Sequence, residues 1–307
     1  MQHHQAANYC KVAKQVYDTI LQPYLKNIPA EINHLIISAH GKLNQVPFDA
    51  LILNKTTTYT KAKFVINRYN IRYALSCNLL YVNKNNKANK NITIISPQYK
   101  QQNNLPFSKQ VINYLTDNFI LTDANNSGIL HVAAHAFCDY SNSRNSYILM
   151  SDTQKLFVGA IATQSLKYKL AVLTACQTAN GNIEAGEGVI NFSRGFYLAG
   201  VTSTITSLWK VDDEATAGVI KNFYTNLIAG QSAINSLYTA KLNYLKNTKT
   251  MDDYDPYYWA GLIYTGNDVV LQKENTNCYW IVFFVILGVA GALFLVRNTL
   301  IRKKLKT

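Results

Sequence analysis

The most informative stretch of the sequence, residues 170–180, reads LAVLTACQTAN. It begins with four apolar residues, a run typical of a buried β-strand. The run then gives way to small and polar residues, so Cys176 is expected in the loop that follows the strand. Loops at strand ends are where reacting side chains collect. The stretch therefore predicts a strand with a reactive cysteine at its exit, and the alternative is a small buried core cysteine.

A second stretch, about 40 residues upstream, has the same plan. Residues 128–136 read GILHVAAHA, an apolar strand with a polar residue at its exit. A cysteine and a histidine at the ends of two buried strands are the minimum for a thiolate nucleophile and its base. A free thiol has a pKa of about 8.5 and needs such a base at neutral pH. We predict Cys176 as the nucleophile and His135 as the base, which later protonates the leaving amine.

His131 is the competing histidine. It lies inside the expected strand, between Leu130 and Val132, so we interpret it as a packed residue. A zinc site of His131 and His135 would need a helix to bring positions i and i+4 together, usually with a glutamate between them. The intervening residues are Val-Ala-Ala. No metal and no organic cofactor are expected.

These features resemble the CHAT family, caspase-like domains related to separase that often follow tetratricopeptide repeats in bacterial proteins. A caspase signature likewise has Ala before the cysteine and a histidine about 50 residues upstream. The resemblance covers roughly residues 5–270. The matching segments are 46–51, 73–76, 129–135, 173–178, 186–188, 194–200, 207–213, 223–224 and 256–260. The resemblance implies a cysteine endopeptidase that cleaves a protein substrate, uses no cofactor and is gated by a protein partner.

The resemblance also implies further site residues. The backbone N–H groups of Ala136 and Cys176 would form the oxyanion hole. The family usually has Gly directly after the second histidine, and the methyl group of Ala136 would crowd the site or change the local dihedral angle. Similarity to the separase pattern W-x-V-x-D suggests that Asp213 lines the S1 pocket and favours a basic P1 residue. The alternative is that Asp212 or Asp213 caps the helix that follows.

Strands and helices alternate along the chain, which predicts an α/β fold with a mainly parallel sheet and helices on both faces. The resemblance makes this sheet caspase-like. In such sheets the site lies at the carboxyl ends of the strands, where His135 and Cys176 fall. Helices are expected at 5–26, 108–116, 157–166, 188–198, 212–229 and 232–246, and strands at 32–37, 64–66, 71–73, 92–96, 128–134, 147–150, 170–175 and 202–208.

The C-terminal segment is apolar enough to span a membrane. Residues 279–296 read YWIVFFVILGVAGALFLV, 18 residues without a charge, followed by five cations in residues 297–306. The cationic tail favours a cytosolic C-terminus, which would place the soluble part outside. Residues 1–30 contain no signal-peptide core that would export it. We expect a single-pass membrane protein and leave the side of the soluble part open.

Three regions are therefore expected. Residues 1–30 are a helical lead-in, 31–272 a CHAT domain with its catalytic half at about 111–272, and 273–307 a transmembrane anchor with a basic tail.

The amino-acid composition indicates which classes of binding partner to expect. The chain has 30 Lys and Arg against 17 Asp and Glu, a net charge of +13, which favours an anionic partner. Lys and Asn are scattered throughout, however, and no zinc-finger, RNP or P-loop pattern occurs, so nucleic acid is not an expected partner. Five cysteines without CxxC spacing argue against a disulfide framework and a structural zinc site.

A second function from another class stays open. The chain could be a catalytically inactive, membrane-tethered interaction scaffold that keeps the fold. The alanine at position 136 and the lack of a visible third catalytic group favour this alternative.

Overall fold

The computed structural model describes residues 2–77, 86–100, 105–122, 128–139, 145–174, 188–248, 250–272, 286–289 and 291. Met1–Leu271 form one compact unit, and Gln272–Thr307 form a second. The helices and strands below all belong to the first unit.

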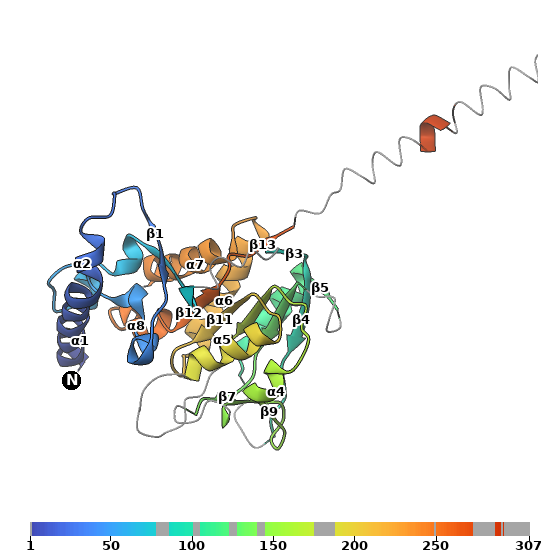
Figure 1. Cartoon of the computed structure of the whole chain (residues 1–307), viewed down its shortest axis with the longest axis horizontal. Helices are drawn as coiled ribbons and strands as arrows, with labels where there is room; N and C mark the ends of the chain where they lie inside the picture. Colours follow the sequence, from blue (N-terminus) through green and yellow to red (C-terminus); the bar gives the residue numbers. More distant parts are fainter. Residues whose placement is uncertain are drawn as a thin grey trace, which may run out of the picture. The chain divides into compact units, whose positions relative to one another are not determined.

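An eight-stranded sheet forms the centre of this unit (Figure 1). Every neighbouring pair is parallel except β11 and β12, which are antiparallel. The expected α/β fold with a mainly parallel sheet is therefore confirmed. The strand order is β1 (His34–Ile37), β2 (Asn70–Tyr73), β12 (Leu262–Gly266), β11 (Ser203–Ser207), β10 (Leu170–Leu173), β6 (Ile129–Val132), β4 (Asn91–Ile95) and β5 (Ile120–Leu121).

Helices lie on both faces of the sheet (Figure 1). On one face, α3, α6 and α7 share a core with Leu170 and Val172 of β10. On the other face, residues of α4 and α5 pack with Ala171 and Leu173. Successive residues of a strand point to opposite faces, so a strand covered on both sides needs an unbroken apolar run. The helices are α3 (Ser108–Asn118), α4 (Val158–Ala162), α5 (Gly188–Leu198), α6 (Asp213–Ile228) and α7 (Ala233–Asn247).

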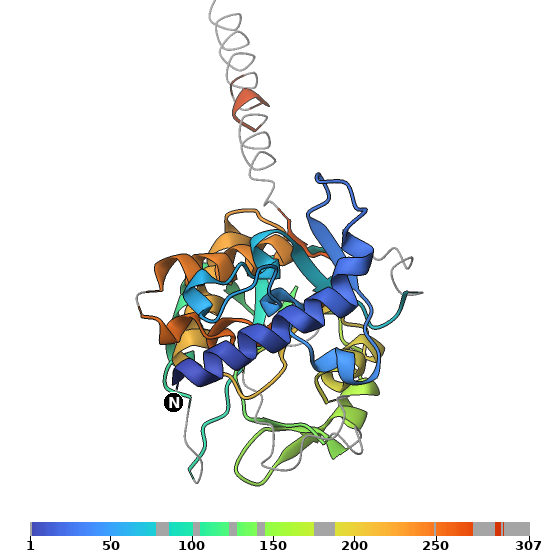
Figure 2. The ribbon, with the colours of Figure 1, turned by 90° about the vertical axis from the view of Figure 1, so that its left-hand side faces the viewer.

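The N-terminal residues form a nearly continuous helix that packs against the same unit. α1 (Gln2–Val16) passes through a π-helical turn, Tyr17–Leu21, into α2 (Gln22–Leu25). Figure 2 shows this helix, in blue, lying across one side of the unit. Cys10 and Ala13 are buried in a core shared with β2 and the segment that precedes it. The amphipathic helix expected at 5–26 is confirmed.

Several short elements differ from the sequence-based expectations. Residues 64–66 do not form a strand: Phe64 makes an isolated bridge to Ile52, and Val65–Asn67 is a 3-10 helix. The helix expected at 157–166 is shortened to α4, since β9 ends at Phe157 and the helix itself ends at Ala162. The strands not predicted include β12 and β5, and also β3 (Lys87–Ala88) with β13 (Val270–Leu271), and β7 (Ala136–Phe137) and β9 (Lys155–Phe157), which flank β8 (Tyr147–Leu149).

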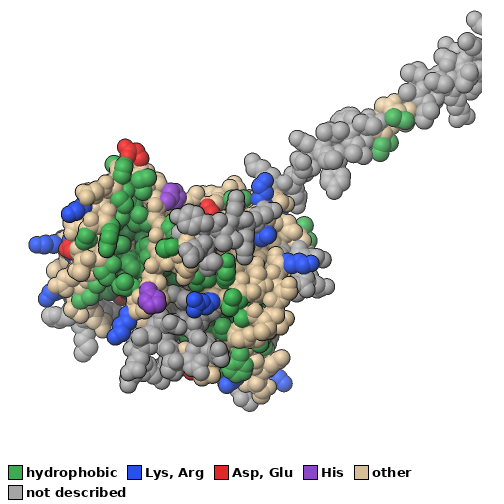
Figure 3. All heavy atoms as spheres, viewed as in Figure 1, with side chains coloured by type: hydrophobic (Ala, Val, Ile, Leu, Met, Phe, Trp, Pro, Cys, Tyr) green, Lys and Arg blue, Asp and Glu red, His purple; other side chains and the backbone are tan. Residues whose placement is uncertain are grey.

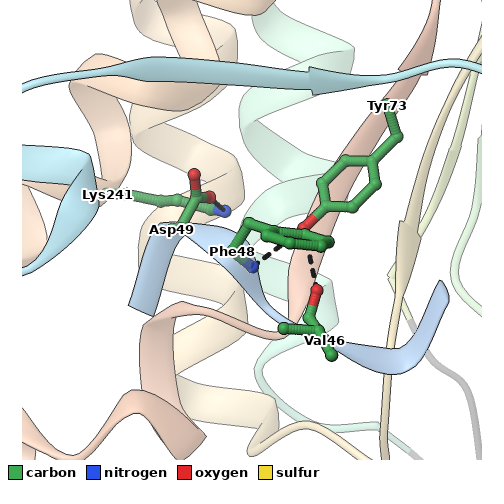
Figure 4. A network of polar contacts seen from close by, with 5 residues as sticks. All are labelled: Val46, Phe48, Asp49, Tyr73 and Lys241. Carbon is green, nitrogen blue, oxygen red and sulfur yellow. Dashed lines mark hydrogen bonds and ion pairs between the residues drawn. The ribbon is translucent and has the colours of Figure 1, made fainter. Parts of the chain in front are cut away.

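A buried polar network joins the segment before β2 to α7 (Figure 4). The ammonium group of Lys241 pairs with the carboxylate of Asp49, and both side chains are buried. The Tyr73 hydroxyl accepts a hydrogen bond from the Phe48 N–H and donates one to the Val46 carbonyl, both at 3.1 Å. The network therefore ties residues 46–49 to elements distant in sequence.

Apolar side chains also reach the surface of this unit. In the left half of Figure 3 they gather over the region of α2 and β1. Tyr24 of α2 is 76% exposed, and Ile36 of the edge strand β1 is 47% exposed.

No helix within the described ranges is long and apolar enough to cross a membrane. The span expected at 279–296 lies outside the described residues, apart from 286–289 and 291.

Candidate functional site

The candidate site lies at the carboxyl ends of β6 and β10. These strands are parallel neighbours, with Val132 opposite Leu173. The Thr174 N–H donates to the Val132 carbonyl at 3.1 Å and so extends the ladder by one residue. The two strands therefore end side by side, at the edge of the sheet where ligands bind in α/β proteins.

His135 follows β6 at this edge. It lies three residues beyond the end of the strand, and its side chain is buried, with 6% of the residue exposed. Cys176 lies outside the described residues, as does the segment 175–187 that carries it. The pairing of these two residues stays a prediction.

Tyr99 contacts His135 and was not predicted as a site residue. Its ring centroid lies 4.8 Å from that of the imidazole, with an angle of 40° between the planes. Its hydroxyl accepts a hydrogen bond from the His135 N–H at 3.1 Å. Tyr99 follows β4, the neighbour of β6. A polar residue shortly after an apolar strand is the pattern that predicted His135, and Tyr99 also has this pattern.

Ala136, the predicted oxyanion residue, opens β7 opposite Ile148 of β8. Its backbone is extended, a conformation that any residue can adopt. Its methyl group is buried in a core with Ile148. The Leu149 N–H donates to the His135 carbonyl, so Ala136 and Ile148 form the non-hydrogen-bonded pair of this ladder. The Ala136 N–H therefore points away from β8, and the position does not need the conformational freedom of glycine.

Asp212 and Asp213 have different hydrogen-bond partners at the start of α6. Asp212 caps the helix by accepting a hydrogen bond from the Ala215 N–H at 2.9 Å. The Asp213 carboxylate instead accepts one from the Phe107 N–H, just before α3, at 2.9 Å. Of the two aspartates expected as possible caps, Asp212 is therefore the one that caps α6.

The Asp213 carboxyl also interacts electrostatically with His135. Burial raises the pKa of Asp213, and the hydrogen bond from Phe107 opposes that shift. Smaller contributions come from Asp212, which raises the pKa, and from His135, which lowers it. Two predicted site residues that lie far apart in sequence therefore influence each other electrostatically.

His131 is a packed residue, as predicted. It is fully buried, and its Nδ1 lies 3.1 Å from the Tyr224 hydroxyl of α6. Burial lowers the pKa of His131 to about 3, so the imidazole is neutral at neutral pH. His131 faces the α6 side of the sheet, whereas His135 lies beyond the carboxyl end of β6. Within the described ranges, no group of three His, Cys, Asp or Glu residues could hold a metal ion.

A groove of about 640 Å³ lies between α6 and α7. Its lining includes the carboxylates of Asp212, Glu214 and Asp253. Burial raises the pKa of Tyr244 in this groove to about 12, and these carboxylates add to the shift. The groove is therefore a negatively charged surface that begins at the same helix end as Asp213.

The comparison with known proteins agrees with the resemblance. A family model described as CHAT domain matches residues 10–267. Tetratricopeptide repeat protein 28 of Mus musculus is 32% identical over 111 residues, which are 36% of this chain. The matched region is 4% of that relative, so the chain corresponds to a small part of it.

Two solved structures are also similar. The separase–securin complex of Saccharomyces cerevisiae superimposes with a TM-score of 0.47 at 10% identity, covering 74% of this chain and 15% of that one. Gingipain R, described as an Arg specific cysteine proteinase, superimposes with a TM-score of 0.46 at 8% identity. That match covers 84% of this chain and 66% of the other.

Proposed function

The chain belongs to the CHAT domain family, and from this premise we propose that it is a cysteine endopeptidase with a His135–Cys176 dyad. Cys176 attacks the peptide carbonyl after His135 takes its thiol proton, and His135 then protonates the leaving amine. The N–H groups of Ala136 and Cys176 hold the oxyanion of the tetrahedral intermediate. Water attacks the acyl-enzyme and releases the second product.

The register of β6 and β10 is the observation that supports this proposal most. Val132 and Leu173 are direct partners in the ladder. His135 follows Val132 by three positions in the sequence, and Cys176 follows Leu173 by three. The segments that carry them therefore leave the sheet from neighbouring points of one edge. A nucleophile and its base need such a common origin, because the base must come within hydrogen-bond reach of the thiol.

Asp213 supports a preference for a basic P1 residue. Its carboxylate is half-buried and interacts with His135, the proposed base. A negative charge in partly desolvated surroundings attracts an ammonium or guanidinium group more strongly than a charge in water does. We therefore assign Asp213 to the S1 pocket.

The inactive scaffold loses one of its two arguments. Its first argument was that Ala136 distorts the site, yet this residue has an ordinary extended backbone and a buried methyl group. Its second argument, the lack of a visible third catalytic group, is unchanged, because Asp213 is assigned to the S1 pocket.

The test uses the full chain in detergent micelles with a mixed peptide library. Wild type, Cys176→Ala and His135→Ala are incubated with the library, and new termini are identified by mass spectrometry. We expect cleavage by the wild type and none by either variant. A peptide with a thiol-reactive electrophile is added in parallel and should label Cys176 in preference to Cys10, Cys77, Cys138 and Cys278. Absence of both cleavage and preferential labelling would favour the scaffold.

Membrane anchoring is a separate proposal. It is supported by the 18 uncharged residues at 279–296 and by the exposed apolar side chains of Ile286, Leu287 and Val289. We propose a single-pass anchor, with a protein partner that regulates the peptidase as the resemblance implies. Flotation with phosphatidylcholine vesicles should carry the full chain, and deletion of 279–296 should abolish it. Equal flotation of both proteins would contradict the anchor.

A further inference from the structure

The hydroxyl group of Tyr99 is inserted between two strands beside His135. It accepts a hydrogen bond from the His135 N–H at 3.1 Å and donates one to the Leu149 carbonyl at 2.7 Å. The Leu149 N–H donates directly to the His135 carbonyl at 2.8 Å. The backbones of His135 and Leu149 are therefore joined by one direct bond and by one bridge through Tyr99.

This arrangement departs from a regular antiparallel ladder. In such a ladder, the two residues of a hydrogen-bonded pair exchange both N–H···O bonds. Here the hydroxyl occupies the place of the second bond, and the ladder of β7 and β8 begins only at Ala136. The Tyr99 hydroxyl therefore replaces one backbone hydrogen bond between His135 and Leu149.

The ring of Tyr99 contacts the side chain that its hydroxyl helps to place. The centroids of the phenol and the imidazole lie 4.8 Å apart, and Tyr99 is 5% exposed. Burial raises the pKa of Tyr99, so the hydroxyl keeps its proton and can donate to Leu149. The ring and the hydroxyl thus restrain both the imidazole and the backbone of one residue.

The neighbouring strand fixes Tyr99 in turn. β4 pairs with β6, Ile95 is the partner of Val132, and the Ala133 N–H donates to the Ile95 carbonyl at 2.8 Å. Tyr99 follows Ile95 by four residues, and His135 follows Val132 by three. The segments that follow β4 and β6 leave the sheet side by side, and the Tyr99 ring contacts the His135 imidazole across them.

We propose that Tyr99 is the positioning residue of the base: it holds the His135 imidazole in the orientation that receives the thiol proton. This inference rests on the proposed role of His135. Tyr99 acts through His135 and takes no part in the bond changes.

Tyr99→Phe removes the hydroxyl and keeps the ring. The Tyr73→Phe variant is the control, because the Tyr73 hydroxyl bridges a backbone N–H and a carbonyl in the same way, but in the network of Phe48 and Val46 (Figure 4). We expect Tyr99→Phe to lower kcat on the order of 10- to 100-fold with KM nearly unchanged, since small misplacements of a reacting group cost this much. We expect kcat of Tyr73→Phe to stay within about twofold of the wild type.

A second measurement does not depend on activity. The full chain, labelled with ¹³C-histidine in detergent micelles, gives imidazole Cε1–Hε1 cross-peaks for its six histidines, and His135→Ala assigns one of them. That cross-peak should move in Tyr99→Phe and stay in place in Tyr73→Phe. If it stays in Tyr99→Phe, or moves equally in both variants, Tyr99 is not the positioning residue.

The two proposals can fail separately. If the wild type neither cleaves the library nor shows preferential labelling of Cys176, but the His135 cross-peak moves only in Tyr99→Phe, the placement by Tyr99 holds and the peptidase fails. If the wild type cleaves and kcat is unchanged in Tyr99→Phe, the peptidase holds and the positioning role fails. Should Tyr99→Phe not fold, the wild-type protein must still give a nuclear Overhauser contact between the Tyr99 ring and the His135 imidazole. Its absence would overturn the proposal.

Discussion

Asp49 and Lys241 form an ion pair inside the protein, with the two side chains 8% and 2% exposed. The pair joins the 3-10 helix Phe48–Ala50 to α7, across 192 positions of sequence. Removing one partner of such a pair leaves the other charge buried without compensation.

We expect Asp49→Ala to lower the free energy of unfolding by about 3–5 kcal/mol. Lys241→Met should have an effect in the same direction, and the double variant Asp49→Leu/Lys241→Met should recover most of the loss, because it leaves no buried charge. Urea unfolding followed by circular dichroism measures all three.

The surface pair of Lys14 and Asp18, with side chains 18% and 39% exposed, is the control. Lys14→Ala should cost less than about 0.5 kcal/mol, since water screens this pair. Equal losses in Asp49→Ala and Lys14→Ala would contradict the prediction.

His131 should make the stability depend on pH. Burial lowers its pKa to about 3, against about 6.5 in an unfolded chain. Between these values the unfolded chain binds a proton that the folded protein does not. The stabilising contribution is therefore complete above about pH 6.5 and is lost as the pH falls toward about 3, by up to about 1.4 kcal/mol per unit.

Urea unfolding of wild type and His131→Gln between pH 4 and 7 measures this dependence. The variant should be less stable at pH 7, because it disturbs the contact with Tyr224. Its stability should also fall less steeply with acid, so the two curves converge at low pH. Parallel curves would show that His131 does not carry the proton linkage.

Asp213→Asn should remove the preference for basic P1 residues. We expect cleavage after Arg and Lys to fall on the order of 10- to 100-fold, about 1.4–2.7 kcal/mol in transition-state binding. Cleavage after other residues should change little. Asp253→Asn is the control, because Asp253 lines the groove between α6 and α7 and is not among the groups that shift the pKa of Asp213. An equal loss in both variants would indicate a general effect of surface charge.

The same residue predicts a pH effect on activity. Burial raises the pKa of the Asp213 carboxyl, so the carboxylate loses its charge at a higher pH than an exposed aspartate does. Cleavage after basic residues should therefore decline as the pH falls through that raised pKa. The ratio of kcat/KM for basic and neutral P1 substrates, measured against pH, should slope in the wild type and be flat in Asp213→Asn. A flat ratio in the wild type would remove Asp213 from the S1 pocket.

Ala136→Gly tests whether the methyl group hinders the site. The methyl is buried with Ile148, and the backbone is extended. Glycine should therefore lower the free energy of unfolding by about 1 kcal/mol, through chain entropy and lost packing. The cleavage rate should stay within about twofold of the wild type, measured on the library peptides. A tenfold gain in rate would instead mean that the methyl group crowds the oxyanion hole.

Local sequence patterns were sufficient for the elements that carry the candidate site. The apolar runs at 128–134 and 170–175 predicted β6 and β10, since a strand buried on both faces needs consecutive apolar residues. Gly200 and Gly230 marked the ends of α5 and α6, and both adopt positive φ angles, which glycine tolerates best. These features depend on neighbouring residues only, so the sequence contains them.

Where local pattern and tertiary pairing disagree, the pattern fails. Residues 64–66 have the composition of a strand, yet only an isolated bridge links Phe64 to Ile52, and a 3-10 helix follows. The strand β12 was not predicted, although it joins β2 to β11. A strand exists only where a partner supplies its hydrogen bonds, and that partner is chosen by the packing of the whole sheet.

From the sequence alone one could predict the α/β class, the helices α5, α6 and α7, and the position of His135 just beyond the end of β6. The tertiary structure was needed to establish the strand order, the antiparallel pairing of β12 with β11 and the contact of Tyr99 with His135. It was also needed to show that Asp213 accepts a hydrogen bond from the Phe107 N–H while Asp212 caps α6. These relationships join residues tens of positions apart. Their energies come from burial and hydrogen bonds that exist only once the sheet has formed, so no local pattern contains them.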